Sequence, residues 1–125
     1  MNIEKISEQV LAQNKEIELF NDDDIYSIVQ MILDEAQELV EATENGFLTD
    51  DLTAVASECA DVAYLLIRLF NELGIDERAV DIKVKRNTEK YSGFTDKDVA
   101  KEAWKKRGGD KVWFESLLTK DDKSI

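Results

Sequence analysis

The sequence LTAVASECADVAYLLIRLF, residues 52–70, decides the fold. Apolar residues recur along it at spacings of three and four, which predicts a long helix with apolar side chains on most of its circumference. Its only charged residues are Glu58, Asp61 and Arg68. At about 100° per residue, Glu58 projects inside the apolar face, where an unpaired carboxylate is costly or takes up a proton. Glu58 therefore needs a cation as its partner, whereas Asp61, on the more polar edge, could pair with Arg68 at the surface.

A second helix, expected over about 24–44, carries a matching pair of acids, Glu35 and Glu38. Glu35 falls on the edge of the apolar arc of this helix, and Glu38 lies about 60° further round. The wider segment 16–67 contains 14 acidic residues and no basic residue. Helix packing would bring the E-x-x-E and E-x-x-D pairs together, and like charges at close range repel. We therefore expect a divalent cation between them and, without it, at least one carboxylate with a raised pKa.

The same spacing of three and four runs through nearly the whole chain, without sustained alternation of period two. It predicts an all-α fold, an antiparallel helical bundle of about five helices that assembles as a homo-oligomer. The chain is expected to form a single domain, 1–125, with a motif core at 25–91 and C-terminal helices at 95–118. The expected helices span about 3–20, 24–44, 50–72, 77–91 and 95 to Gly108-Gly109, followed by a short helix from Asp110 through Trp113, Phe114, Leu117 and Leu118.

Turn and capping residues predict the helix ends. Short polar side chains accept the free N–H groups of a first turn, and glycine favours the turn that follows a helix. The expected signals are Asp24 at the start of the second helix, Asn45-Gly46 at its end, Thr49 or Asp50 before the third, Asp76 before the fourth, and Thr95 with Asp98 at the fifth.

Composition narrows the class of protein. With 43% hydrophobic and 35% charged residues and no proline in 125 residues, the chain suits a mostly helical globular protein. A formal net charge of −12 argues against nucleic acid as a partner. No apolar run approaches the roughly 20 residues of a membrane span, the N-terminus lacks an apolar signal segment, and Cys59 is the single cysteine. We therefore expect a cytoplasmic protein without a membrane partner.

Basic residues gather after the acidic segment. From Arg68 onward the chain has 14 basic and 12 acidic residues. In the fourth helix, Lys83, Asn87 and Lys90 share the inward face, with Arg86 beside them. Two interpretations stay open from the spacing: a buried network of ion pairs with the carboxylates, or a surface that binds phosphate while the carboxylates hold a metal ion.

The side chains available as ligands restrict which metal ion could bind. Four carboxylates in a chain without histidine suit a hard ion, Mg²⁺ first and Mn²⁺ next. Zinc and a ferritin-like di-iron site are disfavoured because the first needs softer ligands and the second needs histidines. Mg²⁺ sites commonly bind substrate phosphates, which indicates phosphoryl or nucleotidyl chemistry. The chain has no P-loop sequence, so it is not a P-loop nucleotidase.

The order of these motifs resembles the all-α nucleoside triphosphate pyrophosphohydrolases, the MazG-like group. E-x-x-E is followed after 19 residues by E-x-x-D, and ECADVAYLLIRLFNELGID is followed by Lys83-x-x-x-Asn87-x-x-Lys90-Tyr91. This second part is similar to the MazG-like and dCTP pyrophosphatase branch. The resemblance covers about 25–91, more than half of the chain.

The resemblance implies hydrolysis of a nucleoside triphosphate, usually a deoxynucleotide, to the monophosphate and pyrophosphate, in a house-cleaning role. It also implies a homodimer or homotetramer with sites shared between subunits. The implied metal ligands are Glu35, Glu38, Glu58 and Asp61, and one of the three glutamates would orient or deprotonate the attacking water. The implied contacts to the phosphates or sugar of the substrate are Lys83, Arg86, Asn87, Lys90 and Tyr91.

Two other readings remain at this point. A hydrolase of the same fold could act on dUTP or phosphoribosyl-ATP. A non-catalytic helical interaction protein could keep the fold, with Lys83 and Lys90 permanently neutralising Glu35 and Glu58. A thermal melt with and without Mg²⁺ distinguishes this interaction protein from an enzyme. A ligand that binds only the folded state must stabilise it, so a metal-dependent enzyme should melt at a higher temperature with Mg²⁺.

Overall fold

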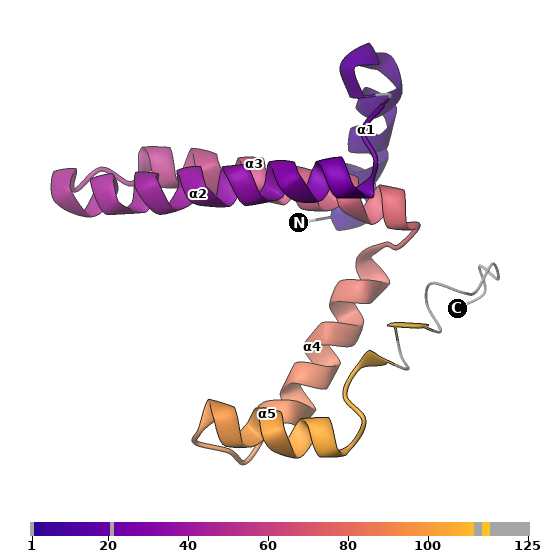
Figure 1. The fold of residues 1–125 in the computed structure, drawn as a ribbon, viewed down its shortest axis with the longest axis vertical. Helices are drawn as coiled ribbons and strands as arrows, with labels where there is room; N and C mark the ends of the chain where they lie inside the picture. Colours follow the sequence, from indigo (N-terminus) through magenta and orange to yellow (C-terminus); the bar gives the residue numbers. More distant parts are fainter. Residues whose placement is uncertain (1, 21, 112–113, 116–125) are drawn as a thin grey trace. The chain divides into compact units, whose positions relative to one another are not determined.

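The computed structural model describes residues 2–20, 22–111 and 114–115. These residues form five α-helices and one short 3-10 helix, without a strand (Figure 1), which confirms the all-α prediction. None of the helices in these ranges is both long and apolar enough to cross a membrane. The elements are α1 (Ile3–Glu16), η1 (Glu18–Phe20), α2 (Ile25–Thr49), α3 (Thr53–Leu73), α4 (Glu77–Tyr91) and α5 (Lys97–Lys106).

The chain divides into two compact units, Met1–Gly74 and Ile75–Ile125. The first contains α1, η1, α2 and α3, and the second contains α4 and α5. The single domain over 1–125 and its assembly as a homo-oligomer stay predictions.

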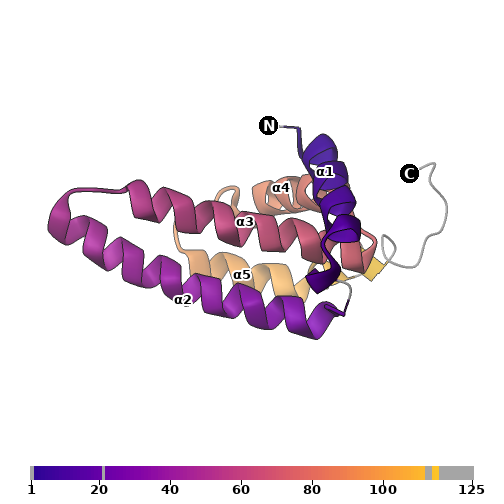
Figure 2. The same cartoon turned by 90° about the horizontal axis from the view of Figure 1, so that it is seen from above.

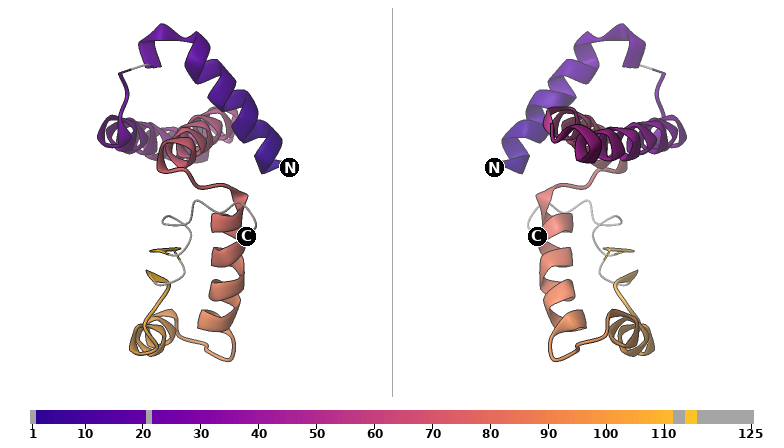
Figure 3. Two further views of the ribbon diagram at one scale, coloured as in Figure 1. Left: turned by 90° about the vertical axis from the view of Figure 1, so that its right-hand side faces the viewer. Right: turned by 90° about the vertical axis from the view of Figure 1, so that its left-hand side faces the viewer.

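In the first unit, α2 and α3 form an antiparallel pair and lie side by side along most of their length (Figures 1 and 2). Helix α1 packs against α3 and runs across the pair (Figure 3). The Ser7 hydroxyl donates a hydrogen bond of 2.7 Å to Asn71 Oδ1, which ties α1 to the end of α3. Among the described side chains of this unit, the buried apolar ones are Val10, Ile28 and Leu65.

The first expected helix, 3–20, is interrupted. Helix α1 ends at Glu16, and Ile17 has extended backbone angles before η1 begins. The N–H of Ile17 donates to the Gln13 carbonyl, which satisfies one of the last carbonyls of α1. The expected cap of the second helix is confirmed, because Asp24 Oδ1 accepts the N–H of Ser27 at 2.8 Å.

The expected end of this helix at Asn45-Gly46 is wrong, because α2 continues to Thr49. Gly46 is buried inside the helix, and a Cβ atom added there would lie 3.0 Å from the carbonyl oxygen of Asp51 and 3.0 Å from Leu52 Cδ2. This glycine therefore allows close packing against the turn. Asp50, with φ of 59°, takes the left-handed conformation that ends the helix.

The start of α3 also differs from the prediction. Neither Thr49 nor Asp50 caps it; the Oδ1 atom of Asp51 accepts the N–H of Thr53 at 3.0 Å. The Thr49 hydroxyl instead donates back to the Asn45 carbonyl at 2.9 Å. Three acceptor side chains follow one another here, and only the path of the turn decides which of them reaches the helix.

In the second unit, α4 has the predicted bounds and the predicted cap, Asp76. Helix α5 is capped by Asp96, whose Oδ1 accepts the N–H groups of Asp98 and Val99, so the expected cap at Thr95 is wrong. Within 75–111 and 114–115, the part of this unit that the structure describes, the buried apolar side chains are Ala79, Ala100 and Trp104. The expected last helix lies largely outside the described residues, including Trp113, Leu117 and Leu118.

Candidate metal site and basic face

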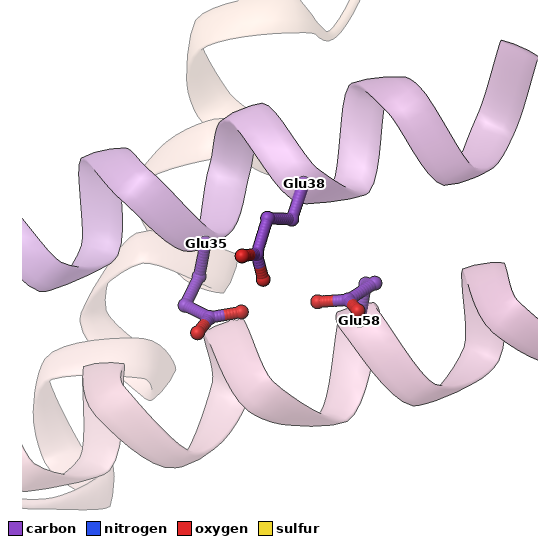
Figure 4. A group of neighbouring side chains, drawn as sticks. All are labelled: Glu35, Glu38 and Glu58. Atoms are coloured by element: carbon purple, nitrogen blue, oxygen red, sulfur yellow. The ribbon is translucent and has the colours of Figure 1, made fainter.

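Three carboxylates meet between α2 and α3. Glu35 and Glu38 lie one turn apart on α2, and Glu58 points toward them from α3 (Figure 4). One oxygen atom of each residue lies within 4.8 Å of the others. The antiparallel pairing of the two helices thus brings together the two motifs, which are far apart along the chain.

Two of these carboxylates each have one oxygen atom that is out of contact with water. Glu35 and Glu58 are half-buried, and Glu38 is exposed. The Oε2 atoms of Glu35 and Glu58 are buried, and neither has a hydrogen-bond partner among the described residues. A buried acceptor without a partner destabilises the folded state, so these two atoms indicate a place for a cation.

The electrostatics of the group confirm the expected rise in one pKa. The pKa of Glu35 is raised from its ordinary value of about 4.5 to about 7. The largest cause is a hydrogen bond with Glu38, which requires a protonated carboxyl; burial, a hydrogen bond with Glu58 and the negative charges of Glu38 and Asp61 act in the same direction. The raised pKa means that Glu35 keeps its proton up to about pH 7, and this proton relieves the repulsion between the neighbouring carboxylates.

The donor set fits a divalent metal ion with a preference for oxygen. All three side chains supply carboxylate oxygens, and the chain contains no histidine. The cysteine next to the group, Cys59, is exposed. Oxygen ligands in this number, with room for water and phosphate, are typical of Mg²⁺ and Mn²⁺.

The fourth predicted ligand, Asp61, lies outside this group of three. It is exposed on α3, and its charge contributes to the raised pKa of Glu35. Its role as a metal ligand stays a prediction. The surface pairing of Asp61 with Arg68 is not present in the described part of the chain, since Arg68 is 2% exposed and its Nη2 atom lies 2.7 Å from Asp23 Oδ2.

A cavity of about 300 Å³ opens beside the carboxylates, entirely within the first unit. The sequence did not predict this cavity or the buried position of Arg68. The available signal was that Arg68 is the only basic residue in a mostly apolar helix. The residues that line the cavity are Phe20, Met31, Asp34, Glu35, Asp61, Tyr64, Leu65 and Arg68.

The predicted basic residues of the second unit are organised around Asp110, which the sequence did not single out. The amino group of Lys83 donates to Asp110 Oδ2, and Trp104 Nε1 donates to Asp110 Oδ1 at 3.1 Å. Burial alone would raise the pKa of Asp110, but Lys83, Lys90 and the Trp104 hydrogen bond together lower it. Asp110 therefore stays ionised and neutralises part of the basic face.

The other predicted substrate contacts lie around Trp104. The guanidinium carbon of Arg86 lies 4.2 Å from the Trp104 ring centroid, and Lys90 Nζ lies 5.9 Å from it. Lys90 Nζ is also 5.7 Å from the Tyr91 ring. Tyr91 is half-buried and Asn87 is exposed. The binding of phosphate by these residues stays a prediction.

Comparison with known proteins identifies the family of this chain. Searches of curated proteins and of solved structures returned no significant match. The profile of the phosphoribosyl-ATP pyrophosphohydrolase family matches residues 3–88, which include the three glutamates and most of α4. The chain therefore belongs to the phosphoribosyl-ATP pyrophosphohydrolase family, within the MazG-like superfamily of all-α nucleoside triphosphate pyrophosphohydrolases.

Proposed function

We propose that this protein is a Mg²⁺-dependent enzyme that converts a nucleoside triphosphate to the monophosphate and pyrophosphate, with Mn²⁺ as a possible substitute. The single observation that carries the proposal is the group of Glu35, Glu38 and Glu58, with two buried oxygen atoms that lack a hydrogen-bond partner. In a pyrophosphohydrolase family, such a group is best explained as the holder of the metal ion that binds the substrate phosphates.

In this proposal, the three glutamates hold the metal, with Asp61 as a further ligand. When bound, the metal ion supplies positive charge to the phosphates and lowers the pKa of a coordinated water. The oxygen of water forms a bond to the α-phosphorus, and the bond from that phosphorus to the bridging oxygen breaks, which releases pyrophosphate. One glutamate of the group would accept the proton that the water loses.

The basic face of α4 is proposed to bind the phosphates or sugar of the substrate. Its residues are Lys83, Arg86, Asn87, Lys90 and Tyr91. Lys83 now pairs with Asp110, so a phosphate would replace or share that carboxylate. Lys83 is half exposed, and Asp110, at 12% exposure, would keep Trp104 Nε1 and Arg86 Nε as its partners after this exchange.

The family match favours a second candidate substrate, phosphoribosyl-ATP, which carries the same triphosphate as ATP. The two candidates require the same metal site and the same bond cleavage. They differ in the group carried by the base, so only a comparison of substrates separates a general house-cleaning enzyme, including one that acts on dUTP, from a hydrolase of phosphoribosyl-ATP.

A second copy of the chain is the proposed partner, as a homodimer or homotetramer in the cytoplasm. Large apolar side chains are exposed along α2 and the turn after it, more than a monomer commonly leaves in contact with water. Examples are Leu33 at 63%, Phe47 at 79% and Leu48 at 84% exposure. Light scattering on the purified chain tests this part of the proposal, and a monomer at all concentrations would contradict it.

The decisive experiment measures pyrophosphate release from a panel of ribonucleotides, deoxyribonucleotides and phosphoribosyl-ATP in the presence of Mg²⁺. Glu58→Gln should abolish the release, because it removes a negatively charged ligand. The matched control, Glu41→Gln, changes an exposed acid on α2 and should retain it. Release of orthophosphate and a diphosphate would overturn the proposed bond, and no reaction with any nucleotide would favour a non-catalytic interaction protein.

A further inference from the structure

The chain after α4 returns to the basic face of that helix. Helix α5 packs against α4 and is followed by Gly108 and Gly109, both with positive φ. Two glycines in succession let the chain turn back sharply, because residues with a side chain rarely adopt such angles. The Gly109 N–H donates to the Trp104 carbonyl at 3.3 Å, and the turn brings Asp110 to the ring nitrogen of the same tryptophan. These residues lie beyond 3–88, the range of the family match.

Three nitrogen donors converge on the Asp110 carboxylate. The Lys83 amino group donates to Oδ2, and Trp104 Nε1 donates to Oδ1 at 3.1 Å. Arg86 Nε lies 3.7 Å from Oδ1. The Asp110 side chain is only 12% exposed, so the donors surround most of it. An ammonium group, a guanidinium group and an N–H donor around one anion are also the groups with which proteins bind phosphate.

Aromatic rings hold the two cations independently of Asp110. The guanidinium carbon of Arg86 lies 4.2 Å from the Trp104 ring centroid, and Lys83 Nζ lies 5.8 Å from the Phe114 ring centroid. A cation within about 6 Å of a ring centroid is attracted to the ring. Lys83 and Arg86 therefore keep these contacts when another anion takes the place of the carboxylate.

Glu89 also pairs with Arg86 but competes less for an incoming anion. Its Oε2 atom lies 3.0 Å from Arg86 Nη1, and its side chain is 56% exposed. In the pair of Arg86 with Asp110 the side chains are 16% and 12% exposed. Because water screens exposed charges more strongly, the negative charge of Asp110 is the one that an anion at this face meets.

We propose that Asp110 is an internal competitor of the substrate, with its carboxylate in the position beside Lys83 and Arg86 that a phosphate group of the nucleotide takes. The assignment of this face to the phosphates rests on the proposed function. When the phosphate binds, Asp110 releases Lys83 and keeps the hydrogen bond from Trp104. The exchange costs free energy for the substrate and for the pyrophosphate product alike, so Asp110 lowers the affinity of both and promotes product release.

The test is the dissociation constant of inorganic tripolyphosphate, measured by calorimetry in the presence of a chelator. Asp110→Asn removes the negative charge and keeps an oxygen atom that accepts the Trp104 hydrogen bond. We expect its dissociation constant to be at least about tenfold lower than that of the wild type, because a like charge beside the ligand is removed. If Asp110 instead only holds Lys83 in position, the variant will bind more weakly. A higher or unchanged dissociation constant, or no binding by either protein, would overturn the proposal.

The matched control is Asp81→Asn, which removes an acid of α4 itself. Asp81 pairs with Lys85, and both side chains are more than half exposed, so the dissociation constant should change by less than about twofold. A second control uses a Lys83→Gln background, in which Asp110→Asn should strengthen binding less than it does with Lys83 present. An equal gain in both backgrounds would overturn the exchange at Lys83. Should Asp110→Asn not fold, Asp110→Ser, which also removes the charge and keeps a side-chain oxygen, is measured instead.

Turnover gives a second readout. Asp110→Asn should lower the KM for the nucleotide by at least about tenfold without raising kcat, because pyrophosphate also leaves more slowly. A raised KM would contradict competition. If no nucleotide releases pyrophosphate, the proposed function fails, and the binding of tripolyphosphate still decides whether Asp110 competes with an anion. If pyrophosphate is released and Asp110→Asn does not bind tripolyphosphate more tightly, this inference fails alone.

Discussion

Glu35 and Glu58 approach each other from two antiparallel helices, with carboxylate oxygens within 4.8 Å, and each keeps one buried oxygen atom without a hydrogen-bond partner. Two acids in this relationship destabilise the metal-free fold unless one is protonated. A divalent cation between them would cancel the repulsion and would give the two buried oxygen atoms a partner. We therefore expect the stability of the helical hairpin to depend on metal binding.

Addition of Mg²⁺ should raise the melting temperature of the wild-type protein. A ligand present at 100 times its dissociation constant stabilises the folded state by about 2.7 kcal/mol when it does not bind the unfolded chain. Glu58→Gln should raise the melting temperature of the metal-free protein, because it removes one of the repelling charges, and should lose most of the response to Mg²⁺. Thermal melts over a series of Mg²⁺ concentrations measure both effects.

Glu41→Gln is the control for this comparison, since Glu41 is exposed on α2 and lies outside the carboxylate group. It should melt like the wild type at every Mg²⁺ concentration. A wild-type protein without any shift at millimolar Mg²⁺, also in the presence of a nucleotide, would contradict a metal site at these glutamates.

The stability of the metal-free protein should fall as the pH rises from about 4.5 to about 7. The pKa of Glu35 is about 7 in the folded state and about 4.5 in its ordinary state, so between these values the folded protein binds more protons than the unfolded chain. More protons on the folded state means that a rising pH favours unfolding. Denaturant unfolding in the presence of a chelator, at a series of pH values, measures this slope.

Glu35→Gln should remove this dependence on pH, because the amide does not titrate in this range. Metal affinity should show the opposite trend, since the proton on Glu35 must leave before the metal binds. Below pH 7 the Mg²⁺ affinity of the wild type should therefore rise by up to about tenfold per pH unit. An affinity independent of pH between 5 and 7 would show that Glu35 is not a ligand.

The sequence predicted those features that depend on local spacing. The apolar period predicted α4 with its correct bounds and its Asp76 cap, and it placed Glu35, Glu38 and Glu58 on faces that meet. It failed where several equivalent signals stood together, as at Thr95 and Asp96, because only the backbone path selects the capping residue.

The features that the sequence did not predict are contacts between distant segments. The ion pairs of Arg68 with Asp23 and of Lys83 with Asp110 join residues far apart in the chain, and neither pair has a periodic signal. Buried cations are rare, so a lone arginine in an apolar helix predicts a partner without identifying it. For the same reason, the sequence did not predict the cavity that Arg68 lines.

Asp110→Ala should destabilise the second unit by about 1–3 kcal/mol, because one buried donor and one half-exposed amino group lose their acceptor. These donors are Trp104 Nε1 and the amino group of Lys83. The chain has two tryptophans, so the fluorescence of Trp104 is followed in a Trp113→Phe background during denaturation.

The matched control is Asp81→Ala, which removes another Lys–Asp pair, between Asp81 and Lys85, in which both side chains are more than half exposed. Exposed pairs contribute little, so this change should cost less than about 1 kcal/mol. Equal losses in the two variants would show that Asp110 acts as an ordinary surface charge.

Gly46→Ala should destabilise the protein, although alanine in place of glycine inside a helix normally stabilises by about 0.5–1 kcal/mol. The added Cβ would lie 3.0 Å from the Asp51 carbonyl oxygen, a backbone atom that moves only if the turn between α2 and α3 shifts. We expect a net loss of about 1–3 kcal/mol, typical of overpacking at a buried position. Asn45→Ala, at the exposed neighbouring position, is the control and should be neutral or stabilising.

Gly46→Ala should also weaken Mg²⁺ binding, because the turn sets the register between Glu35 and Glu58. A variant with the stability and the metal affinity of the wild type would show that the turn can shift to accommodate the added Cβ without loss of free energy.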